Sequence, residues 1–377
     1  MTAPVRAGEP IVVDVPLAEH AYDIIIGRGV AASLGARLAA LRPGAKAAIV
    51  TDENVAKRHL AIVESVLGSA GIKAVRVIVP PGEASKSIAV FDKVCEELIG
   101  ARIERADIVI ALGGGVIGDL AGFAASAVRR GLEYVQVPTT LLAQVDSSIG
   151  GKTGINSRQG KNLIGAFHQP ILVLADTALL DTLPARLMRA GYAEVVKYGL
   201  LGDADFFSWL EANWQEIFSG GPAREHAIAV SCRMKASIVA RDERETGERA
   251  LLNFGHTFGH AAEAAAGFSD RLHHGEAIAI GMVLALTFSV RRGLMPQADA
   301  DQVIRHFAAA GLPTKLSDIP GQLPDAERLM ELVAQDKKVK RGKLTFIISR
   351  GIGRAFVASD VDAADAGAFL AEQLSKQ

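Results

Sequence analysis

The chain has 377 residues, which at roughly 150 residues per domain is enough for two domains. Its 41 Lys and Arg residues and 42 Asp and Glu residues give a net charge of −1 at pH 7, and a nucleic-acid-coating surface needs a net basic charge. With 49% hydrophobic and 22% charged residues, the composition is that of a folded globular chain rather than a disordered one. The two cysteines, Cys95 and Cys232, supply neither a disulfide framework nor a cysteine zinc site.

The sequence also bears on localisation. Residues 1–9 lack the charged start and apolar run of a secretory signal. The longest apolar stretch, residues 277–290, is shorter than the ~18 residues of a membrane span and contains Gly281, Thr287 and Ser289. We therefore expect a cytoplasmic protein with neither a membrane nor a nucleic acid as partner.

The first half of the chain alternates short apolar, β-branched runs with helical patterns. Predicted strands span residues 22–26, 47–51, 74–79, 108–112, 134–137 and 171–174. Continuous apolar runs are typical of strands buried on both faces, and strand–helix alternation indicates a parallel sheet with right-handed crossovers. The pattern predicts a Rossmann-like, doubly wound α/β domain over residues 1–184.

After Pro184 the pattern changes to long helices. These are predicted over residues 186–200, 206–217, 224–241, 250–266, 276–291 and 299–310. One predicted hairpin interrupts them, with strands at residues 343–349 and 354–358. We expect a boundary near residue 185 and a mainly α-helical C-terminal domain over residues 185–377.

A glycine-rich turn follows the predicted strand 108–112. Gly113, Gly115 and Gly118 match the spacing GxGxxG, and a predicted helix opens at Val116. The N–H groups at such a helix start can hold a phosphate or pyrophosphate. The pattern alone is weak, but the strand before it and the helix after it favour a dinucleotide site. A tight strand-to-helix turn without a ligand is the alternative.

Two regions could supply the acidic ligand of the dinucleotide ribose. The usual spacing of about 20 residues after the glycine motif points to Glu133. The end of an earlier strand presents Asp52 instead, and the turn after the next strand adds Glu83 and Lys86. Asp52 and Glu83 could equally stabilise helix N-termini, Asp52 as a cap and Glu83 through the helix dipole.

A second glycine-rich segment, residues 144–156, places Asp146 and Lys152 around paired glycines. Lys161 and Asn162 follow after a further glycine. Lysines beside glycines suit an anionic ligand, because the backbone can approach it and the ammonium group supplies charge. The alternative is a flexible surface loop.

The helical half holds the clearest metal-binding pattern. His256 and His260 lie one turn apart on one helix face, His274 opens another predicted helix, and Glu194 lies three residues before Lys197 on a third. Two histidines and a carboxylate with an open position form the ligand class of catalytic Zn²⁺. Spacing alone leaves open whether His256 pairs with His260, or one of the two with His274.

Six longer motifs occur in a fixed order along the chain. They are GGGVIGD (113–119), VPTTLLAQVDSSIGGKTGIN (137–156), KNLIGAFHQP (161–170), GYAEVVKYG (191–199), NFGHTFGHA (253–261) and HHGEAIAIGM (273–282). In these motifs, and over residues 51–339, the chain resembles the 3-dehydroquinate synthase family of the sugar-phosphate cyclase superfamily. The resemblance implies a dehydroquinate synthase-like fold.

The resemblance also implies an activity. The enzyme would convert 3-deoxy-D-arabino-heptulosonate 7-phosphate into 3-dehydroquinate and phosphate, a step of the shikimate pathway to aromatic amino acids. Tightly held NAD⁺ would oxidise C5, phosphate would be eliminated, the hydride would return, and ring opening and aldol closure would follow. Zn²⁺ or Co²⁺ would bind the C4 and C5 hydroxyls as a Lewis acid.

Site residues are implied motif by motif. The metal ligands would be Glu194, His256 and His274, which makes His260 a substrate or proton-transfer residue. The other substrate-pocket residues implied are Asp146, Lys152, Asn162, Lys197, Lys235, Arg249 and Asn253. The NAD⁺ contacts implied are Asp52, Asn54, Glu83, Lys86, Gly115, Val116, Ile117, Gly118, Asp119, Thr139, Thr140, Lys152, Lys161 and Thr182. This assignment moves the ribose contact away from Glu133.

The substrate phosphate would be reached by one lysine of Lys337 and Lys338 and by Arg130 across the interface of a homodimer. Charge-assisted binding of carboxylate and phosphate by Arg and Lys is strong, so these residues argue against a metal- and NAD-dependent polyol dehydrogenase. A cyclase acting on another sugar phosphate and a non-catalytic nucleotide-binding regulator are further alternatives. A hydrolytic use of the metal would leave the glycine-rich turn without a role.

Overall fold

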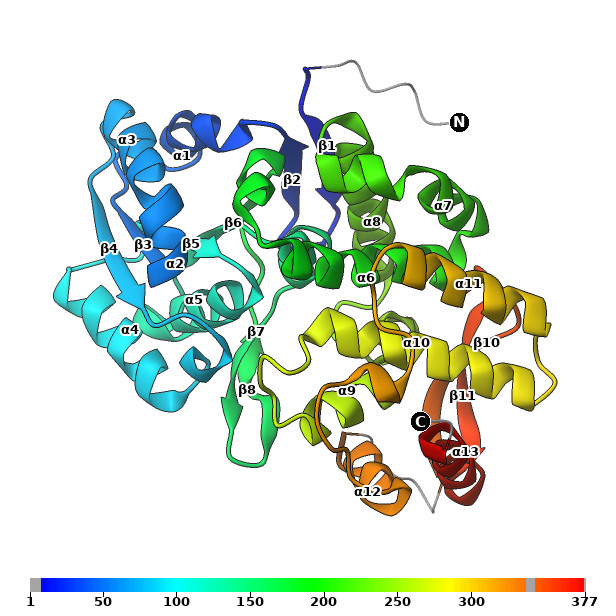
Figure 1. Cartoon of the computed structure of the whole chain (residues 1–377). Coiled ribbons are helices and arrows are strands. Elements are labelled where there is room, and N and C mark those ends of the chain that lie inside the picture. The colour runs from blue at the N-terminus through cyan, green and yellow to red at the C-terminus, as the bar shows by residue number, and fades with distance from the viewer. Residues whose placement is uncertain (1–7, 337–342, 376–377) are drawn as a thin grey trace. The chain divides into compact units, whose positions relative to one another are not determined.

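The computed structural model describes residues 8–336 and 343–375 (Figure 1). The chain divides into two compact units: unit 1 is Met1–Pro184 with Ser219–Arg244, and unit 2 is Ala185–Phe218 with Glu245–Gln377. The expected boundary near residue 185 is one division point, but the single boundary does not hold for residues 219–244. Their helix, α8 (Pro222–Arg241), packs on β1 (Ile11–Val15) and β2 (Tyr22–Gly27) of unit 1, which places it with the α/β domain.

Unit 1 is built on a seven-stranded sheet of order β1-β2-β9-β6-β5-β3-β4. Its strands are β1 (Ile11–Val15), β2 (Tyr22–Gly27), β3 (Ala47–Asp52), β4 (Ala74–Val79), β5 (Ile108–Gly113), β6 (Glu133–Pro138) and β9 (Leu172–Asp176). Neighbouring strands pair in parallel except β1 and β2, which are antiparallel. All six predicted strands are present, and β1 is an additional strand that the pattern did not indicate.

Helices cover both faces of this sheet (Figure 1). One core cluster joins the sheet to α1 (Leu34–Leu41) and α3 (Ala61–Ser69), and the other joins it to α4 (Ile88–Gly100) and α5 (Gly115–Ala127). A short helix, α2 (Glu53–Val55), leads from β3 towards α3. Two cores on opposite faces of a mostly parallel sheet confirm the predicted doubly wound architecture.

The segment around Lys152 is a hairpin rather than the flexible loop considered as an alternative. β7 (Lys152–Ser157) and β8 (Gly160–Phe167) pair antiparallel, and β7 packs on α5. The two strands approach so closely that a Cβ atom on Gly165 would lie 2.1 Å from the Thr153 carbonyl oxygen. The glycines of this segment therefore have a structural reason in addition to any role in ligand binding.

Unit 2 is mainly helical, as predicted. Its helices are α6 (Ala185–Gly202), α7 (Ala204–Ser219), α9 (His256–Ala265), α10 (His274–Arg291), α11 (Gln297–Ala309), α12 (Ala326–Asp336) and α13 (Ala363–Ser375). The predicted hairpin is formed by β10 (Lys343–Ser349) and β11 (Ala355–Asp362). α10 packs against α6, α9 and α11 and is long and apolar enough to cross a membrane, with a mean hydropathy of 1.2. Because 78% of it is buried inside the structure, it has the character of a core helix.

The continuous helix predicted over residues 250–266 is wrong. The chain instead forms a 3₁₀ turn at Glu248–Asn253, and α9 begins at His256. Gly255 between them has a φ of +80°, and a Cβ atom there would lie 2.5 Å from Met282 Cγ on α10. Close packing against α10 therefore requires a glycine and breaks the helix at this point, so that His256 begins α9.

Candidate functional site

Three side chains of unit 2 converge from three helices. Glu194 lies on α6, while His256 and His274 are the first residues of α9 and α10. One ligand atom from each lies within 4.8 Å of the others. Glu194 Oε1 is 3.8 Å from His256 Nε2 and 3.5 Å from His274 Nε2. One carboxylate and two imidazoles form a donor set suited to Zn²⁺ or a similar ion with a position left open, so the residues fit a catalytic divalent metal.

The charges around this cluster differ from residue to residue. Lys197 Nζ is 2.5 Å from Glu194 Oε2, and both side chains are almost fully buried. Burial and the positive charge of Lys197 hold the pKa of His256 well below 6.5, which keeps its ring neutral and able to bind a metal. Burial also acts to lower the pKa of His274, but hydrogen bonds with Glu194 and Glu263 outweigh it and raise that pKa to about 10. A metal that binds His274 must therefore displace a proton.

A second set of potential ligands shares one histidine with the first. His260, Glu263 and His274 also offer ligand atoms within 4.8 Å of one another. His274 Nδ1 is 3.1 Å from Glu263 Oε2. The carboxylates of Glu194 and Glu263 therefore face opposite nitrogens of the same imidazole ring. Spacing in the sequence did not single out Glu263.

Two further predicted substrate residues lie in unit 2, close in sequence to α9. Arg249 is 1% exposed on the 3₁₀ turn that precedes α9. Asn253 ends that turn, and its side-chain amide donates to Glu245 Oε1 at 2.8 Å. Arg249 is thus a buried cationic residue directly before the helix that carries His256 and His260.

In unit 1 the predicted nucleotide residues gather at the carboxyl edge of the parallel sheet. The sheet order runs outward from β3 to β4 on one side and from β5 to β6 on the other, so the topology switches between β3 and β5. Ligands of open α/β sheets bind at such a switch point. Asp52 ends β3 and Gly113 ends β5, and Thr139 with Thr140 follows β6.

Glu133 does not belong to this edge. It is the first residue of β6, at the opposite end of the strand, and its carboxylate accepts a hydrogen bond from Arg42 Nε at 2.5 Å. The interpretation of Glu133 as a ribose ligand from spacing alone is therefore wrong. Asp52 lies at the correct edge and caps α2, because its Oδ1 accepts from the N–H groups of Asn54 and Val55. The capping role considered for Asp52 is thus present in the structure.

The glycine-rich turn leads directly into α5. Gly114 is the N-cap and the helix begins at Gly115, one residue before the predicted opening. A Cβ atom on Gly113 would lie 2.6 Å from Ile117 Cβ, so the first turn of α5 folds back over the end of β5. The open N–H groups of this turn are the part of the edge best suited to a pyrophosphate.

Predicted residues from three segments form one polar network beside this turn. Lys86 Nζ donates to Asp119 Oδ2 at 2.6 Å and also to the side chain of Asn162. Glu83 Oε1 lies 3.7 Å from Lys161 Nζ. Burial raises the pKa of Asp119, while the nearby Lys86 acts to lower it.

Asn156 is part of this network but was not predicted as a site residue. Its side-chain Nδ2 donates to Glu83 Oε1 at 2.8 Å, and its side-chain Oδ1 accepts from the backbone N–H of Asn162 at 2.9 Å. Asn162 has a φ of +57°, so Asn156 supports a left-handed residue. The feature of the sequence that could have identified Asn156 is its position as the last residue of the long glycine-rich motif, residues 137–156.

The remaining predicted residues of unit 1 are placed as follows. Lys235 on α8 donates to Asp146 Oδ1 at 2.7 Å, which joins two predicted substrate residues. The Thr182 hydroxyl lies 2.9 Å from Nε2 of His59, a buried histidine that sequence analysis missed. Lys152 is exposed at the start of β7. Lys337 and Lys338 lie outside the described residues.

Arg130 stands in an unusual backbone turn. Arg129, Arg130 and Gly131 have consecutive φ values of +55°, +66° and +120°. Left-handed backbone at two successive non-glycine residues is strained, and such strain is concentrated at functional sites. The side chain of Arg130 is exposed.

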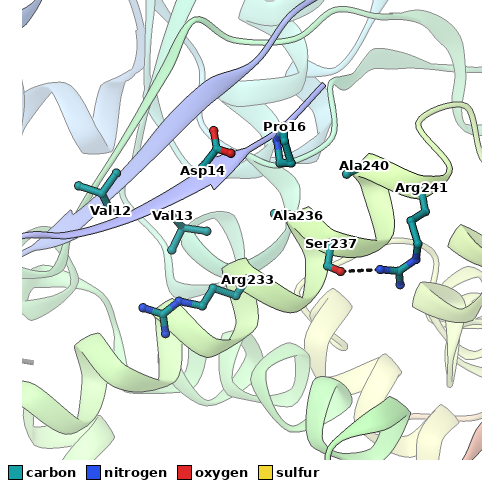
Figure 2. Close-up of a pocket in the computed structure, with 9 residues that line it drawn as sticks. All are labelled: Val12, Val13, Asp14, Pro16, Arg233, Ala236, Ser237, Ala240 and Arg241. Carbon is teal, nitrogen blue, oxygen red and sulfur yellow. Dashed lines mark hydrogen bonds between the residues drawn. The ribbon is translucent and has the colours of Figure 1, made fainter. Parts of the chain in front are cut away.

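Figure 2 shows a separate groove of about 400 Å³ on unit 1. It is lined by β1 and the C-terminal part of α8, with Val12 on one side and Arg233 and Arg241 on the other. Within the groove, Arg241 Nη1 donates a hydrogen bond to the Ser237 hydroxyl oxygen at 2.5 Å. None of the residues that line it is a predicted site residue, so the groove is not part of the candidate site.

Comparison with known proteins gives consistent matches over the whole chain. Residues 76–190 match the family model described as 3-dehydroquinate synthase N-terminal, and residues 191–339 match 3-dehydroquinate synthase C-terminal. A 3-dehydroquinate synthase of Rhodopseudomonas palustris is 66% identical over 380 residues, covering 100% of both chains.

Two solved structures have the same fold. One is 2-deoxy-scyllo-inosose synthase complexed with carbaglucose-6-phosphate, NAD⁺ and Co²⁺, with a TM-score of 0.85 and 26% identity over 96% of this chain and 100% of that one. The other is 2-epi-5-epi-valiolone synthase from Streptomyces hygroscopicus subsp. jinggangensis with NAD⁺ and Zn²⁺ bound. Its TM-score is 0.86, with 28% identity over 96% of this chain and 99% of that one.

Proposed function

We propose that this chain, which belongs to the 3-dehydroquinate synthase family, carries out its reaction with a bound divalent metal and bound NAD⁺. That reaction converts 3-deoxy-D-arabino-heptulosonate 7-phosphate into 3-dehydroquinate and phosphate, so the chain is a phosphate-eliminating lyase that also closes a ring. Family membership selects this activity over the polyol dehydrogenase and the non-catalytic regulator. The observation that carries the proposal is the convergence of Glu194, His256 and His274.

A divalent metal, Zn²⁺ or Co²⁺, would be held by these three side chains, and when bound it supplies Lewis-acid polarisation of a substrate hydroxyl. The donor set and the neutral His256 ring support this role, as do the metals in the two related cyclase structures. Lys197 keeps Glu194 oriented through their buried ion pair. Glu194 can therefore offer its other oxygen, Oε1, on the side of the two histidines.

NAD⁺ would lie on the carboxyl edge of the sheet in unit 1, where it supplies a reversible hydride acceptor when bound. The open N–H groups at the start of α5, over Gly115–Ile117, suit its pyrophosphate, and Gly118 and Asp119 are further proposed contacts on the same turn. Asp52 at the end of β3 and Asn54 in the following α2 would contact a ribose, and Glu83 and Lys86 after β4 are further proposed contacts. The remaining proposed contacts are Thr139, Thr140, Lys152, Lys161 and Thr182.

The substrate carries a carboxylate and a phosphate, and basic residues would bind both. The basic residues proposed for this are Lys152, Lys197, Lys235 and Arg249, and Asp146, Asn162 and Asn253 would add hydrogen bonds to the substrate. His260 lies beside His256, with ring centroids 5.1 Å apart, and is the proposed proton-transfer residue. We place the enzyme in the cytoplasm and in the shikimate pathway.

The direct test is to incubate the purified chain with NAD⁺, Zn²⁺ and the heptulosonate phosphate. The proposal expects phosphate release equal to product formed with no accumulation of NADH, because the hydride returns to the substrate. Steady growth of NADH absorbance would contradict it. His256→Ala and Lys152→Ala should abolish phosphate release, whereas Lys73→Ala, at an exposed lysine on the loop before β4, should retain it.

The proposed homodimer has its own test. If Arg130 completes the site of a partner copy, Arg130→Ala and Lys152→Ala homodimers are each inactive, but a mixed dimer contains one complete site. Mixed dimers should then recover about half of wild-type activity, as two-fold symmetry requires. Absence of recovery in isolated mixed dimers would show that Arg130 acts within its own subunit.

A further inference from the structure

Glu263 is a buried acidic residue of unit 2 to which neither the motifs nor the comparisons assign a role. α9 carries His256, His260 and Glu263 at its first, fifth and eighth positions, so all three share one helix face. Glu263 is 3% exposed. Its Oε2 atom is 3.1 Å from His274 Nδ1. The ring of His274 therefore lies between two carboxylates, with Glu263 at Nδ1 and Glu194 at Nε2.

We propose that Glu263 is a positioning residue that holds His274 in the tautomer and orientation needed to bind the metal. An ionised carboxylate can only accept hydrogen bonds, so the nitrogen that faces Glu263 must carry the proton. A neutral imidazole has a single N–H group, and fixing it at Nδ1 leaves the lone pair at Nε2. Nε2 is the atom that faces Glu194 and the rest of the ligand cluster. This inference rests on the proposed metal site.

The packing of α9 against α10 makes this contact rigid. A Cβ atom on Gly281 of α10 would lie 2.0 Å from the Gly255 carbonyl oxygen, and one on Gly259 of α9 would lie 2.9 Å from the Ala277 carbonyl oxygen. The two helices are therefore in backbone contact beside the cluster, and their separation is fixed by glycines. Glu263 and His274, one on each helix, are held at hydrogen-bond distance by this packing.

A different role for Glu263 would be that of a ligand in a second metal site. His260, Glu263 and His274 are close enough for this. In that case, however, His274 would bind through Nδ1, and a ring that serves both sites would have to lose both of its protons. A carboxylate hydrogen-bonded to the far nitrogen of a metal-bound histidine is the commoner arrangement, and its loss typically weakens metal binding about 10–100-fold. The geometry therefore favours one metal with Glu263 behind its ligand.

The test compares Glu263→Ala and Glu263→Gln in metal-free protein titrated with Zn²⁺ against a competing chelator. We expect Glu263→Ala to weaken Zn²⁺ binding about 10–100-fold at a stoichiometry of one per chain. Glu263→Gln should weaken it less, because its amide oxygen still accepts from Nδ1–H without the charge. His260→Ala is the matched control on the same helix face, and it should keep the wild-type Zn²⁺ affinity.

A spectroscopic readout separates positioning from a purely structural role. In the Zn²⁺-loaded protein, nitrogen-15 NMR should show a proton on His274 Nδ1 that is protected from exchange, and this protection should be lost in Glu263→Ala. Two zinc ions per chain, or an equal loss of binding in Glu263→Ala and His260→Ala, would overturn the inference in favour of a ligand role. Unchanged Zn²⁺ affinity in Glu263→Ala would overturn it as well. If the wild-type chain binds no Zn²⁺, the proposed metal site itself fails, and this is a distinguishable result.

Discussion

Two parts of the molecule carry candidate sites, the metal cluster of unit 2 and the nucleotide edge of unit 1, and they use different features of the polypeptide. In unit 2, ligand atoms come from the side chains of Glu194, His256 and His274 on three packed helices. In unit 1, the nucleotide edge consists of the turns after strands, where glycines expose backbone N–H groups. A metal requires a few atoms at fixed separations, which rigid helices provide, whereas a dinucleotide requires a long backbone surface that it can approach closely.

The two parts also differ in what burial does to charge. In unit 2, His274 gains a pKa of about 10 because two carboxylates face it, although its burial acts in the opposite direction. His306, which is also buried there but lies against Tyr192 and Phe207, has its pKa lowered to about 4. Burial acts to lower the pKa of both histidines, and at His274 the two carboxylates outweigh it. In unit 1, the charged groups of the edge are paired with one another, as Lys86 is with Asp119.

The largest effect is expected at Glu194, where the metal cluster and a buried ion pair coincide. Glu194→Ala removes one of three ligands and also removes the carboxylate 2.5 Å from Lys197. Breaking a buried pair from one side costs about 3–5 kcal/mol of unfolding free energy. We expect loss of bound zinc by elemental analysis, loss of activity, and a destabilisation of that size in urea unfolding.

The double variant Glu194→Ala/Lys197→Met serves as the control for this prediction. Removing both charges should restore much of the stability, because the buried ammonium group is no longer present. It should not restore zinc binding. Zinc content equal to that of the wild type in either variant would show that another carboxylate is the ligand.

At the nucleotide edge, the strongest expected effect comes from a single added methyl group. Gly113→Ala places a Cβ atom 2.6 Å from Ile117 Cβ, so the first turn of α5 must shift. Overpacking of this kind costs about 1–3 kcal/mol. Because the shift moves the proposed pyrophosphate site, calorimetry should show NAD⁺ affinity lowered about tenfold or more, the equivalent of about 1.4 kcal/mol.

Gly68→Ala is the matched control in the same unit. Gly68 is exposed on α3, and no atom lies within 4 Å of an added Cβ. Alanine should stabilise that helix by up to about 1 kcal/mol and leave NAD⁺ affinity unchanged. Equal NAD⁺ affinities in the two variants would show that the turn at Gly113 does not bind the dinucleotide.

Local sequence patterns were sufficient for most of the fold. The buried runs of unit 1 and the long amphipathic stretches of unit 2 carry their own periodicity, so six strands and the central helices were predicted correctly. The pattern failed where structure depends on distant contacts. The break at Gly255 arises from contact with Met282, and α8 joins unit 1 because it packs on β1. Neither partner is visible from the local sequence.

The same limit applies to the site. The glycine-rich turn and the histidine pair were recognisable because their residues are close in sequence. Glu133 was misleading because spacing after the motif does not show at which end of a strand a residue lies. Asn156 and Glu263 were missed because each acts through a residue on another element, Asn156 through Asn162 and Glu263 through His274.

The smallest expected effect tests whether burial alone keeps a histidine of unit 2 neutral. His306 on α11 is 4% exposed, its Nε2 lies 3.0 Å from the Tyr192 hydroxyl, and burial lowers its pKa from 6.5 to about 4. Between these two values the unfolded chain binds a proton that the folded chain does not, so the free energy of unfolding falls as the pH falls from 6.5 to 4. Below the folded pKa both states are protonated and the loss is complete.

Between about pH 7.5 and about pH 5.5 this single group should cost about 1 kcal/mol of stability. His306→Gln cannot titrate, so its stability in urea unfolding should fall by about that much less than the wild type over the same interval. A His306 pKa near 6.5 by NMR, or equal pH dependence in the two proteins, would contradict the prediction. Either result would mean that burial does not keep His306 neutral. The difference in pKa between His306 and His274 could then not be explained by the two carboxylates that face His274 alone.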